Sequence, residues 1–178
     1  TLAKHLAAVT NSVYACEWAR PYLESLPSPE TTPERMTMIA AGQRAHEAAA
    51  ARHAEDKGCP FLILDTDLLS TIGYDRFLTR EDHRDVSWVM RLNRMQEWFV
   101  PGDLYLLCAP DIPVERDPLR YGGGERDTSM RYWRELLVEN GLEFTEISGE
   151  LSQRSVSAYE AIVECLEDRA GFADYRRS

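Results

Sequence analysis

The sequence predicts an α/β fold in which a parallel sheet carries helices on both faces. Strand-like and helical segments alternate along the chain, as they do where crossover helices connect parallel strands. The best strand, residues 60–64, is apolar at nearly every position, which is typical of a strand buried on both faces. With 178 residues, 44% of them hydrophobic and 28% charged, the chain is long enough for one domain with a sizeable core.

The first half of the chain is predicted to hold two strands between helices. The predicted helices cover 2–8, 19–26, a long Ala-rich segment that runs to 57, then 68–77 and 82–99, and the predicted strands cover 12–16 and 60–64. Thr31 and Glu34 form the predicted capping box of the long helix, with Pro33 in its first turn. Gly58 is expected to end that helix.

The second half continues the same alternation. The pattern predicts strands at 103–108 and 144–147 and helices at 129–139 and 152–169. Between the first of these strands and the next helix, residues 109–126 are polar, charged and rich in glycine. We expect this stretch to be a mobile loop because it lacks the apolar periodicity of a packed element.

Composition excludes several classes of partner. The net charge of −10 argues against a nucleic-acid surface or an anionic membrane as the main partner. No apolar run approaches the roughly 18 residues that a membrane-spanning helix needs. The four cysteines are far apart and include no CxxC pair, so we expect reduced thiols in a cytoplasmic protein. An anionic substrate such as ATP stays compatible, with local Arg, Lys or Mg²⁺ to neutralise it.

Carboxylates follow the predicted strands at the points where the strands end. Glu17 follows the first strand, Asp65 and Asp67 the second, Asp111 the third and Glu150 the fourth. Ligands of open parallel sheets bind beyond the carboxyl ends of the strands. A base, a metal-holding carboxylate and cations from an Arg-rich loop are the parts that phosphoryl transfer needs, so this edge predicts that chemistry.

Three motifs carry a resemblance to a known family. They are Glu17-Trp18-Ala19-Arg20, the Asp65-Thr66-Asp67 that succeeds a buried strand, and the loop that runs from Asp111 through Arg116-Asp117 to Leu119-Arg120. From Thr1 to about Ala161 the sequence resembles the ribosylnicotinamide (nicotinamide riboside) kinase domain of the NadR type, within the P-loop NTPase superfamily. One departure is Asp117-Pro118, where the family has Asp-Gly.

The resemblance implies a P-loop kinase-like parallel sheet with the P-loop strand at its centre. The motif GxxxxGK[ST] does not occur in these residues, yet Thr1 and the apolar helix after it match the residues that succeed the Gly-Lys of that motif. We therefore expect a single kinase domain, residues 1–178, whose first strand and Walker A glycines precede Thr1 in a longer polypeptide. The expected lid covers about 110–126, and relatives are often fused to an upstream adenylyltransferase domain.

The resemblance also implies roles for individual residues, with ATP and Mg²⁺ as the cofactors. Glu17 would act as the base on the acceptor hydroxyl, and the lid arginines Arg116 and Arg120 would stabilise the transferring phosphoryl group. Thr1 and Asp65 would hold Mg²⁺, and Thr1 and Arg126 would bind the nucleotide. The expected substrate-binding residues are Trp18, Arg20, Tyr22 and Asp67.

Each of these residues also has a structural interpretation. Glu17 can be a solvated loop acid, and Arg20 can form a surface ion pair with Glu24. Asp67 and Thr1 can be helix caps, and Trp18 and Tyr22 can belong to the core. The leading function is ATP-dependent phosphorylation of nicotinamide riboside to nicotinamide mononucleotide. The alternatives are another nucleoside or small-metabolite kinase, a non-catalytic module that senses a pyridine nucleotide, and an inactive structural fragment.

Overall fold

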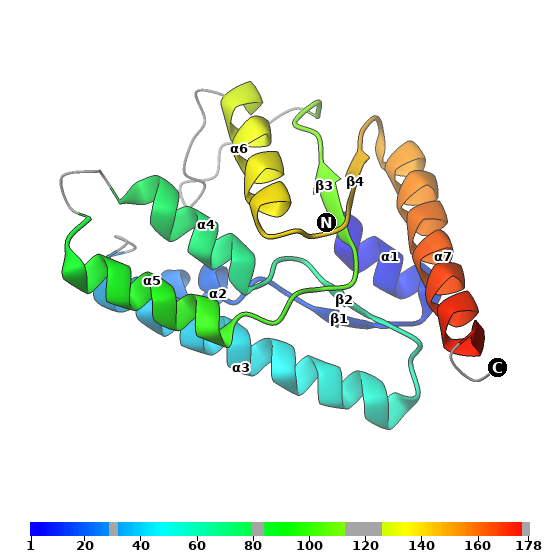
Figure 1. Cartoon of the computed structure of the whole chain (residues 1–178), viewed down its shortest axis with the longest axis horizontal. Coiled ribbons are helices and arrows are strands. Elements are labelled where there is room, and N and C mark those ends of the chain that lie inside the picture. The colour runs from blue at the N-terminus through cyan, green and yellow to red at the C-terminus, as the bar shows by residue number, and fades with distance from the viewer. Residues whose placement is uncertain (29–31, 80–83, 113–125, 176–178) are drawn as a thin grey trace. The chain divides into compact units, whose positions relative to one another are not determined.

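The chain forms two compact units, Thr1–Val100 and Pro101–Ser178, each of which contains parallel strands and helices. The computed structural model describes residues 1–28, 32–79, 84–112 and 126–175 (Figure 1). Parallel strands connected through helices confirm the predicted α/β class. Within the described part of the chain, no helix combines the length and hydropathy that crossing a membrane requires.

The N-terminal unit is built around one pair of parallel strands. Its elements are α1 (Leu2–Thr10), β1 (Val13–Ala15), α2 (Ala19–Glu24), α3 (Pro33–Lys57), β2 (Leu62–Leu64), α4 (Leu68–Leu78) and α5 (Val86–Trp98). β1 pairs with β2, with Val13 opposite Leu62 and Ala15 opposite Leu64. The long helix α3 lies between the two strands in sequence and contacts β1, β2, α4 and α5 (Figure 1).

The start of α3 corrects one prediction. The N-cap is Thr32, whose hydroxyl accepts from the Arg35 amide at 3.3 Å, and not Thr31 as predicted. Thr32 precedes Pro33, and the proline ring disfavours helical backbone angles at the residue before it. Thr32 is accordingly extended, with φ −104° and ψ 162°, which is the conformation of an N-cap. At the other end Gly58 adopts φ 65° and terminates the helix, as predicted.

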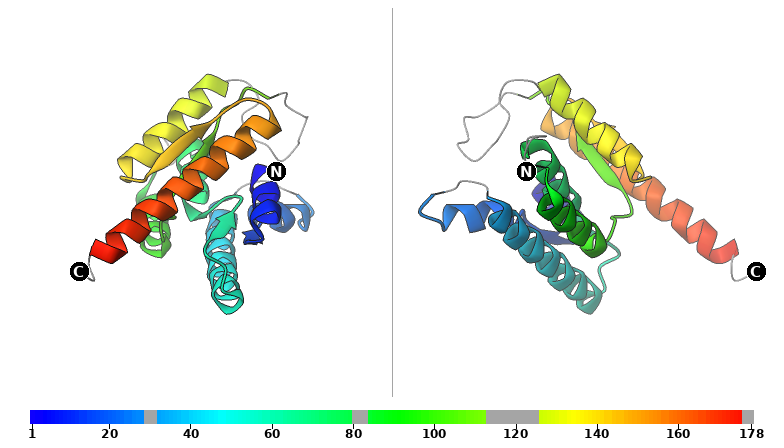
Figure 2. Two further views of the ribbon diagram at one scale, coloured as in Figure 1. Left: turned by 90° about the vertical axis from the view of Figure 1, so that its right-hand side faces the viewer. Right: turned by 60° about the vertical axis from the view of Figure 1, so that its left-hand side comes forward.

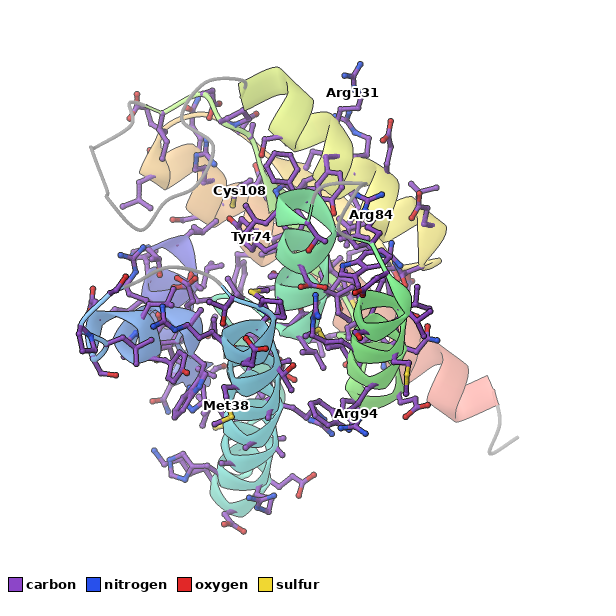
Figure 3. All side chains as sticks on the ribbon, turned by 90° about the vertical axis from the view of Figure 1, so that its left-hand side faces the viewer. Met38, Tyr74, Arg84, Arg94, Cys108 and Arg131 are labelled. Carbon is purple, nitrogen blue, oxygen red and sulfur yellow. The ribbon has the colours of Figure 1, made fainter. Side chains whose placement is uncertain are left out.

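One stripe of α3 supplies the core of this unit. Met36, Ile39 and Ala40 pack with Leu68 and Ile72 of α4, and with residues of α5. Further along the same stripe, Ala50 and Ala54 pack under Val13 and Ala15 of β1. On the opposite side of the helix Met38 is 58% exposed, and Figure 3 shows its side chain projecting from α3. The helix therefore joins the strand pair to α4 and α5 through a single buried face.

Arg84 connects the end of α4 to the start of α5. Its guanidinium donates to the Arg76 carbonyl at 2.9 Å and to the Thr79 carbonyl at 3.2 Å. The same group lies 5.2 Å from the ring centroid of Trp88, within cation–π range (Figure 3). Asp85 caps α5, which begins at Val86, later than the predicted start at residue 82.

The C-terminal unit repeats the parallel arrangement on a smaller scale. It contains β3 (Tyr105–Cys108), α6 (Arg126–Glu139), β4 (Phe144–Ile147) and α7 (Leu151–Tyr175). Tyr105 pairs with Phe144, and Cys108 pairs with Ile147. Figure 2 shows α6 on one side of this strand pair and α7 on the other, as predicted for a sheet with helices on both faces. β4 matches its predicted span of 144–147, whereas β3 is shorter than predicted because its ladder begins only at Tyr105.

A buried ion pair connects α4 to α5. Nη2 of Arg91 lies 3.1 Å from Oδ1 and 3.4 Å from Oδ2 of Asp75, and its Nε lies 3.3 Å from Oδ1. The side chains are 12% and 2% exposed, so water screens neither of them. Removing one partner of such a pair leaves the other charge buried without compensation.

We therefore expect Asp75→Ala to lower the free energy of unfolding by about 3–5 kcal/mol. Urea denaturation monitored by tryptophan fluorescence measures this change. The double variant Asp75→Leu/Arg91→Met should be markedly more stable than the single variant, because it buries no charge. Glu146→Gln is the matched control, since the Arg134–Glu146 pair is 42% and 45% exposed and should matter little. A loss below about 1 kcal/mol for Asp75→Ala would show that this pair contributes no more than a surface ion pair.

Candidate functional site

The parallel register brings the segments after β1 and β2 to the same edge of the N-terminal sheet. Ala15 is opposite Leu64, and the ladder continues for one step because the Asp65 amide donates to the Ala15 carbonyl at 2.9 Å. Glu17 and Asp65 therefore leave the sheet at the same, carboxyl end. This is the edge at which ligands of parallel α/β sheets bind.

Thr1, Tyr14 and Asp65 come together at this end of the sheet. The Tyr14 hydroxyl donates to Oδ2 of Asp65 at 3.1 Å, and the Thr1 side chain hydrogen-bonds the same tyrosine. Thr1 is also the N-cap of α1, where its hydroxyl accepts from the Lys4 amide at 3.3 Å. A helix N-terminus, a hydroxyl and a carboxylate thus meet around one phenol.

The protonation state of Tyr14 depends on these neighbours. Burial raises its pKa above the ordinary value of 10.0. The hydrogen bond with Thr1 acts against this rise, and the negative charge of Asp65 adds to it. At neutral pH the phenol therefore keeps its proton and serves as a donor to the Asp65 carboxylate.

Glu17 lies beside Arg20, one turn further along the chain. Oε2 of Glu17 and Nε of Arg20 are 3.7 Å apart, and the two side chains are 34% and 39% exposed. The sequence left open whether Arg20 would pair with Glu24, and the structure contains a pair of Arg20 with Glu17. At this exposure the ion pair adds little stability. Both groups are accessible to a bound molecule.

Trp18 lies directly against the backbone of α3. A Cβ atom added at Gly42 would be only 1.8 Å from Nε1 of Trp18, so glycine is needed for this close approach. The His46 ring lies 6.0 Å from the indole, and its Nε2 is 3.8 Å from Sγ of Cys16. Trp18 remains 37% exposed and presents aromatic surface, whereas Tyr22 packs against the core around α3 and α4.

Asp67 is the N-cap of α4, which is the structural role that the sequence left open for it. Its Oδ1 accepts from the Ser70 amide at 3.2 Å, and the residue is 8% exposed. A second acid, Glu47 of α3, is also buried and accepts a hydrogen bond from the Leu68 amide. Burial raises the pKa of Glu47; a hydrogen bond from Gln43 acts against this rise, and the charge of Asp67 adds to it.

Gln43 and Glu47 were not predicted from the sequence as part of a site. Both lie on the buried stripe of α3, at helical spacing from Met36, Ile39 and Ala50. An amphipathic helix normally carries apolar residues at such positions. A glutamine and a glutamate there could have indicated from the sequence that these two residues have a specific role. The Ala-rich composition of the helix concealed it, because alanine occurs on both faces.

In the C-terminal unit, the residues after the two strands are joined by a buried arginine. Arg154 of α7 is 4% exposed and donates to the carbonyls of Ala109 at 2.9 Å and Gly149 at 2.6 Å. It also forms an ion pair with Asp111, which accepts in addition from the Gly149 amide at 2.6 Å. Asp111, noted in the sequence as a strand-end acid, is thus held by structural partners.

The remaining predicted site residues are arginines of the second unit. Arg116 and Arg120 lie outside the described residues, as does most of the expected lid. Arg126 begins α6, and the structure does not describe its side chain. The roles assigned to these arginines stay predictions.

The oxygen donors of Thr1 and Asp65 fit Mg²⁺. A hydroxyl and a carboxylate are hard donors of the kind that this ion takes one or two of, with water and phosphate oxygens completing the shell. Tyr14 hydrogen-bonds both groups, so they share one small region of the sheet edge. None of the four cysteines, all of which the structure describes, forms a disulfide.

Comparison with known families identifies the family of the chain. A family model described as an AAA domain matches residues 1–154, and a search of curated proteins finds no match. Such domains are nucleotide-binding domains of the P-loop NTPase type, in agreement with the superfamily that the motifs indicated. The match covers most of the chain, and the protein therefore belongs to the AAA domain family.

Proposed function

We propose that the protein transfers the γ-phosphate of ATP to the 5′-hydroxyl of nicotinamide riboside, which gives nicotinamide mononucleotide. The observation that carries the proposal is the cluster of Thr1, Tyr14 and Asp65 at the carboxyl end of the β1–β2 pair, with Glu17 leaving the same end. Because the chain belongs to a P-loop nucleotide-binding family, the proposed phosphate donor is a nucleotide. The acceptor comes from the resemblance of the Glu17, Asp65 and Asp111 motifs to nicotinamide riboside kinases.

In this proposal Thr1 and Asp65 would hold Mg²⁺. The ion, when bound, neutralises charge on the phosphate oxygens. Tyr14 keeps its proton because its pKa is raised, so its hydrogen bond to Asp65 persists and fixes the orientation of that carboxylate. The resemblance assigns Arg116 and Arg120 the stabilisation of charge in the transition state, and Arg126 the binding of the nucleotide.

Glu17 would accept the proton of the attacking hydroxyl. A general base must be accessible to the acceptor, and Glu17 is 34% exposed at the sheet edge. Its partner Arg20 lies 3.7 Å away and is itself accessible to substrate. Both properties support the kinase over a module that binds a nucleotide without turnover, because a sensor has no use for an accessible base.

The exposed aromatic surface of Trp18 suits a cationic pyridinium ring. A cation over an indole face gains about 0.5–2 kcal/mol. Tyr22 would border the same acceptor site from α2, although it packs partly into the core. Asp67, which caps α4 through Oδ1, would also contact ribose hydroxyls. Another nucleoside or small-metabolite kinase is the second candidate, and the choice of acceptor separates the two.

The acceptor assay tests the proposed function directly. With the full-length protein and MgATP, kcat/KM for nicotinamide riboside should exceed that for uridine, cytidine or thymidine by at least about tenfold, given the cation–π and ribose contacts. Coupled detection of ADP measures each rate. Equal or better activity on a neutral nucleoside would replace this acceptor with the second candidate, and binding of ATP with no turnover on any acceptor would favour the sensing module.

Glu17→Gln tests the proposed base. The variant should lower kcat by about two to four orders of magnitude, because an amide cannot accept the acceptor's proton, while ATP affinity stays nearly unchanged. Glu24→Gln is the matched control, since it removes an exposed acid from the neighbouring helix α2. Retention of more than about half of the wild-type kcat by Glu17→Gln would remove Glu17 from the mechanism.

Gly42→Ala tests the acceptor role of Trp18. The new Cβ would overlap the indole, so the ring must leave its present place, whereas alanine otherwise favours a helix. We expect KM for nicotinamide riboside to rise on the order of tenfold, with KM for ATP unchanged. Steady-state kinetics measure both constants, with Ala41→Ser on the exposed face of α3 as the control. An unchanged acceptor KM would exclude Trp18 from acceptor binding.

A further inference from the structure

The side-chain carboxamide of Gln43 bridges the two strand ends of the candidate site. Its Oε1 accepts from the Trp18 amide at 3.0 Å, and its Nε2 donates to the Thr66 carbonyl at 3.0 Å. Trp18 follows β1 and Thr66 follows β2, so one side chain from α3 holds both segments. Gln43 is 2% exposed, and its hydrogen bonds are therefore protected from competition with water.

Glu47 fixes the direction in which this carboxamide points. Oε1 of Glu47 accepts from Nε2 of Gln43 at 3.1 Å, so the NH₂ group uses one hydrogen on Glu47 and the other on Thr66. A flipped amide would place its oxygen against both the Thr66 carbonyl and the Glu47 carboxylate, and its NH₂ against the Trp18 N–H. Every contact would then be repulsive, so only one orientation is stable.

The bridge is adjacent to the proposed base and to the proposed metal-holding carboxylate. Glu17 immediately precedes Trp18, and Thr66 lies between Asp65 and Asp67. Glu47 extends the same network to the start of α4 through the Leu68 amide. Gln43 therefore holds the backbone one residue away from the proposed base and one residue away from the proposed metal-holding carboxylate. The distance between these two groups depends on this link.

We propose that Gln43 is a positioning residue for phosphoryl transfer, which sets the place of Glu17 relative to Asp65 by holding the backbones of Trp18 and Thr66. The proposal rests on the kinase function proposed above. It assigns Gln43 no contact with substrate, and its effect on turnover passes through Glu17. A displacement of about 1 Å between reacting groups lowers the rate by up to about a hundredfold, so loss of the link should lower kcat strongly.

A double-mutant cycle between positions 43 and 17 tests this role. In the full-length protein, Gln43→Leu should lower kcat for nicotinamide riboside by about tenfold to a hundredfold. KM for ATP should stay within about twofold, because Thr1, Tyr14 and Asp65 retain their own contacts. In the Glu17→Gln background the same replacement should change kcat by less than about twofold, since the group that it positions is gone.

The controls separate positioning from general stability. Gln96→Leu, on the exposed face of α5, makes the same chemical change away from the bridge and should leave kcat unchanged. Urea denaturation reports whether each variant is folded. Should Gln43→Leu fail to fold, Gln43→Asn replaces it, because the amide is retained but is one methylene too short to reach both strand ends. Either variant enters the same cycle.

Each outcome decides the proposal. A kcat loss that is present in the wild-type background and absent with Glu17→Gln supports it. Equal losses in both backgrounds, or an unchanged kcat for both Gln43 variants, would overturn the positioning role and leave the kinase function standing. A wild-type protein that phosphorylates no acceptor would overturn the proposed function itself, and the positioning role with it.

Discussion

The parallel ladder between β1 and β2 is the constraint on which the N-terminal unit depends. Side chains alternate between the faces of a strand, so a slip of one residue would turn Tyr14 away from Asp65. It would also shift the exits of the two strands, and with them Glu17 and Thr66. The register is held by burial: Val13, Ala15 and Ile63 are all in the core, and a slip would expose them. The packing of these strands therefore determines which side chains meet at the carboxyl edge of the sheet.

Both units use a buried polar side chain from a helix to join the ends of two parallel strands. Gln43 does so after β1 and β2, and Arg154 does so after β3 and β4. Burying such groups is unfavourable unless every donor and acceptor is used, and here backbone amide and carbonyl groups beyond the strands supply partners. Loops that leave a short strand have few neighbours of their own. Hydrogen bonds from the helix side chain therefore replace the strand-to-strand hydrogen bonds, which stop where the strands end.

The sequence predicted the class of the fold and most of its elements, because periodicity, glycine and proline act locally. The cap of α3 was misplaced by one residue, since the conformational restriction imposed by Pro33 on Thr32 outweighed the capping-box pattern. Glu17, Asp65 and Trp18 were found from strand ends and family motifs. Gln43 and Tyr14 were not, because their partners lie 23 to 51 residues away in sequence and only the fold brings them together.

The contact between Trp18 and Gly42 restricts which sequences this fold can adopt. The two positions are 24 residues apart, and a change at one disturbs the other: a side chain at 42 overlaps the indole, while a smaller residue at 18 leaves a gap over the bare helix backbone. Related sequences should therefore exchange the two residues together, with a small side chain at 18 wherever 42 is no longer glycine. Statistical coupling between these columns of an alignment would arise from steric exclusion alone, without any shared role in catalysis.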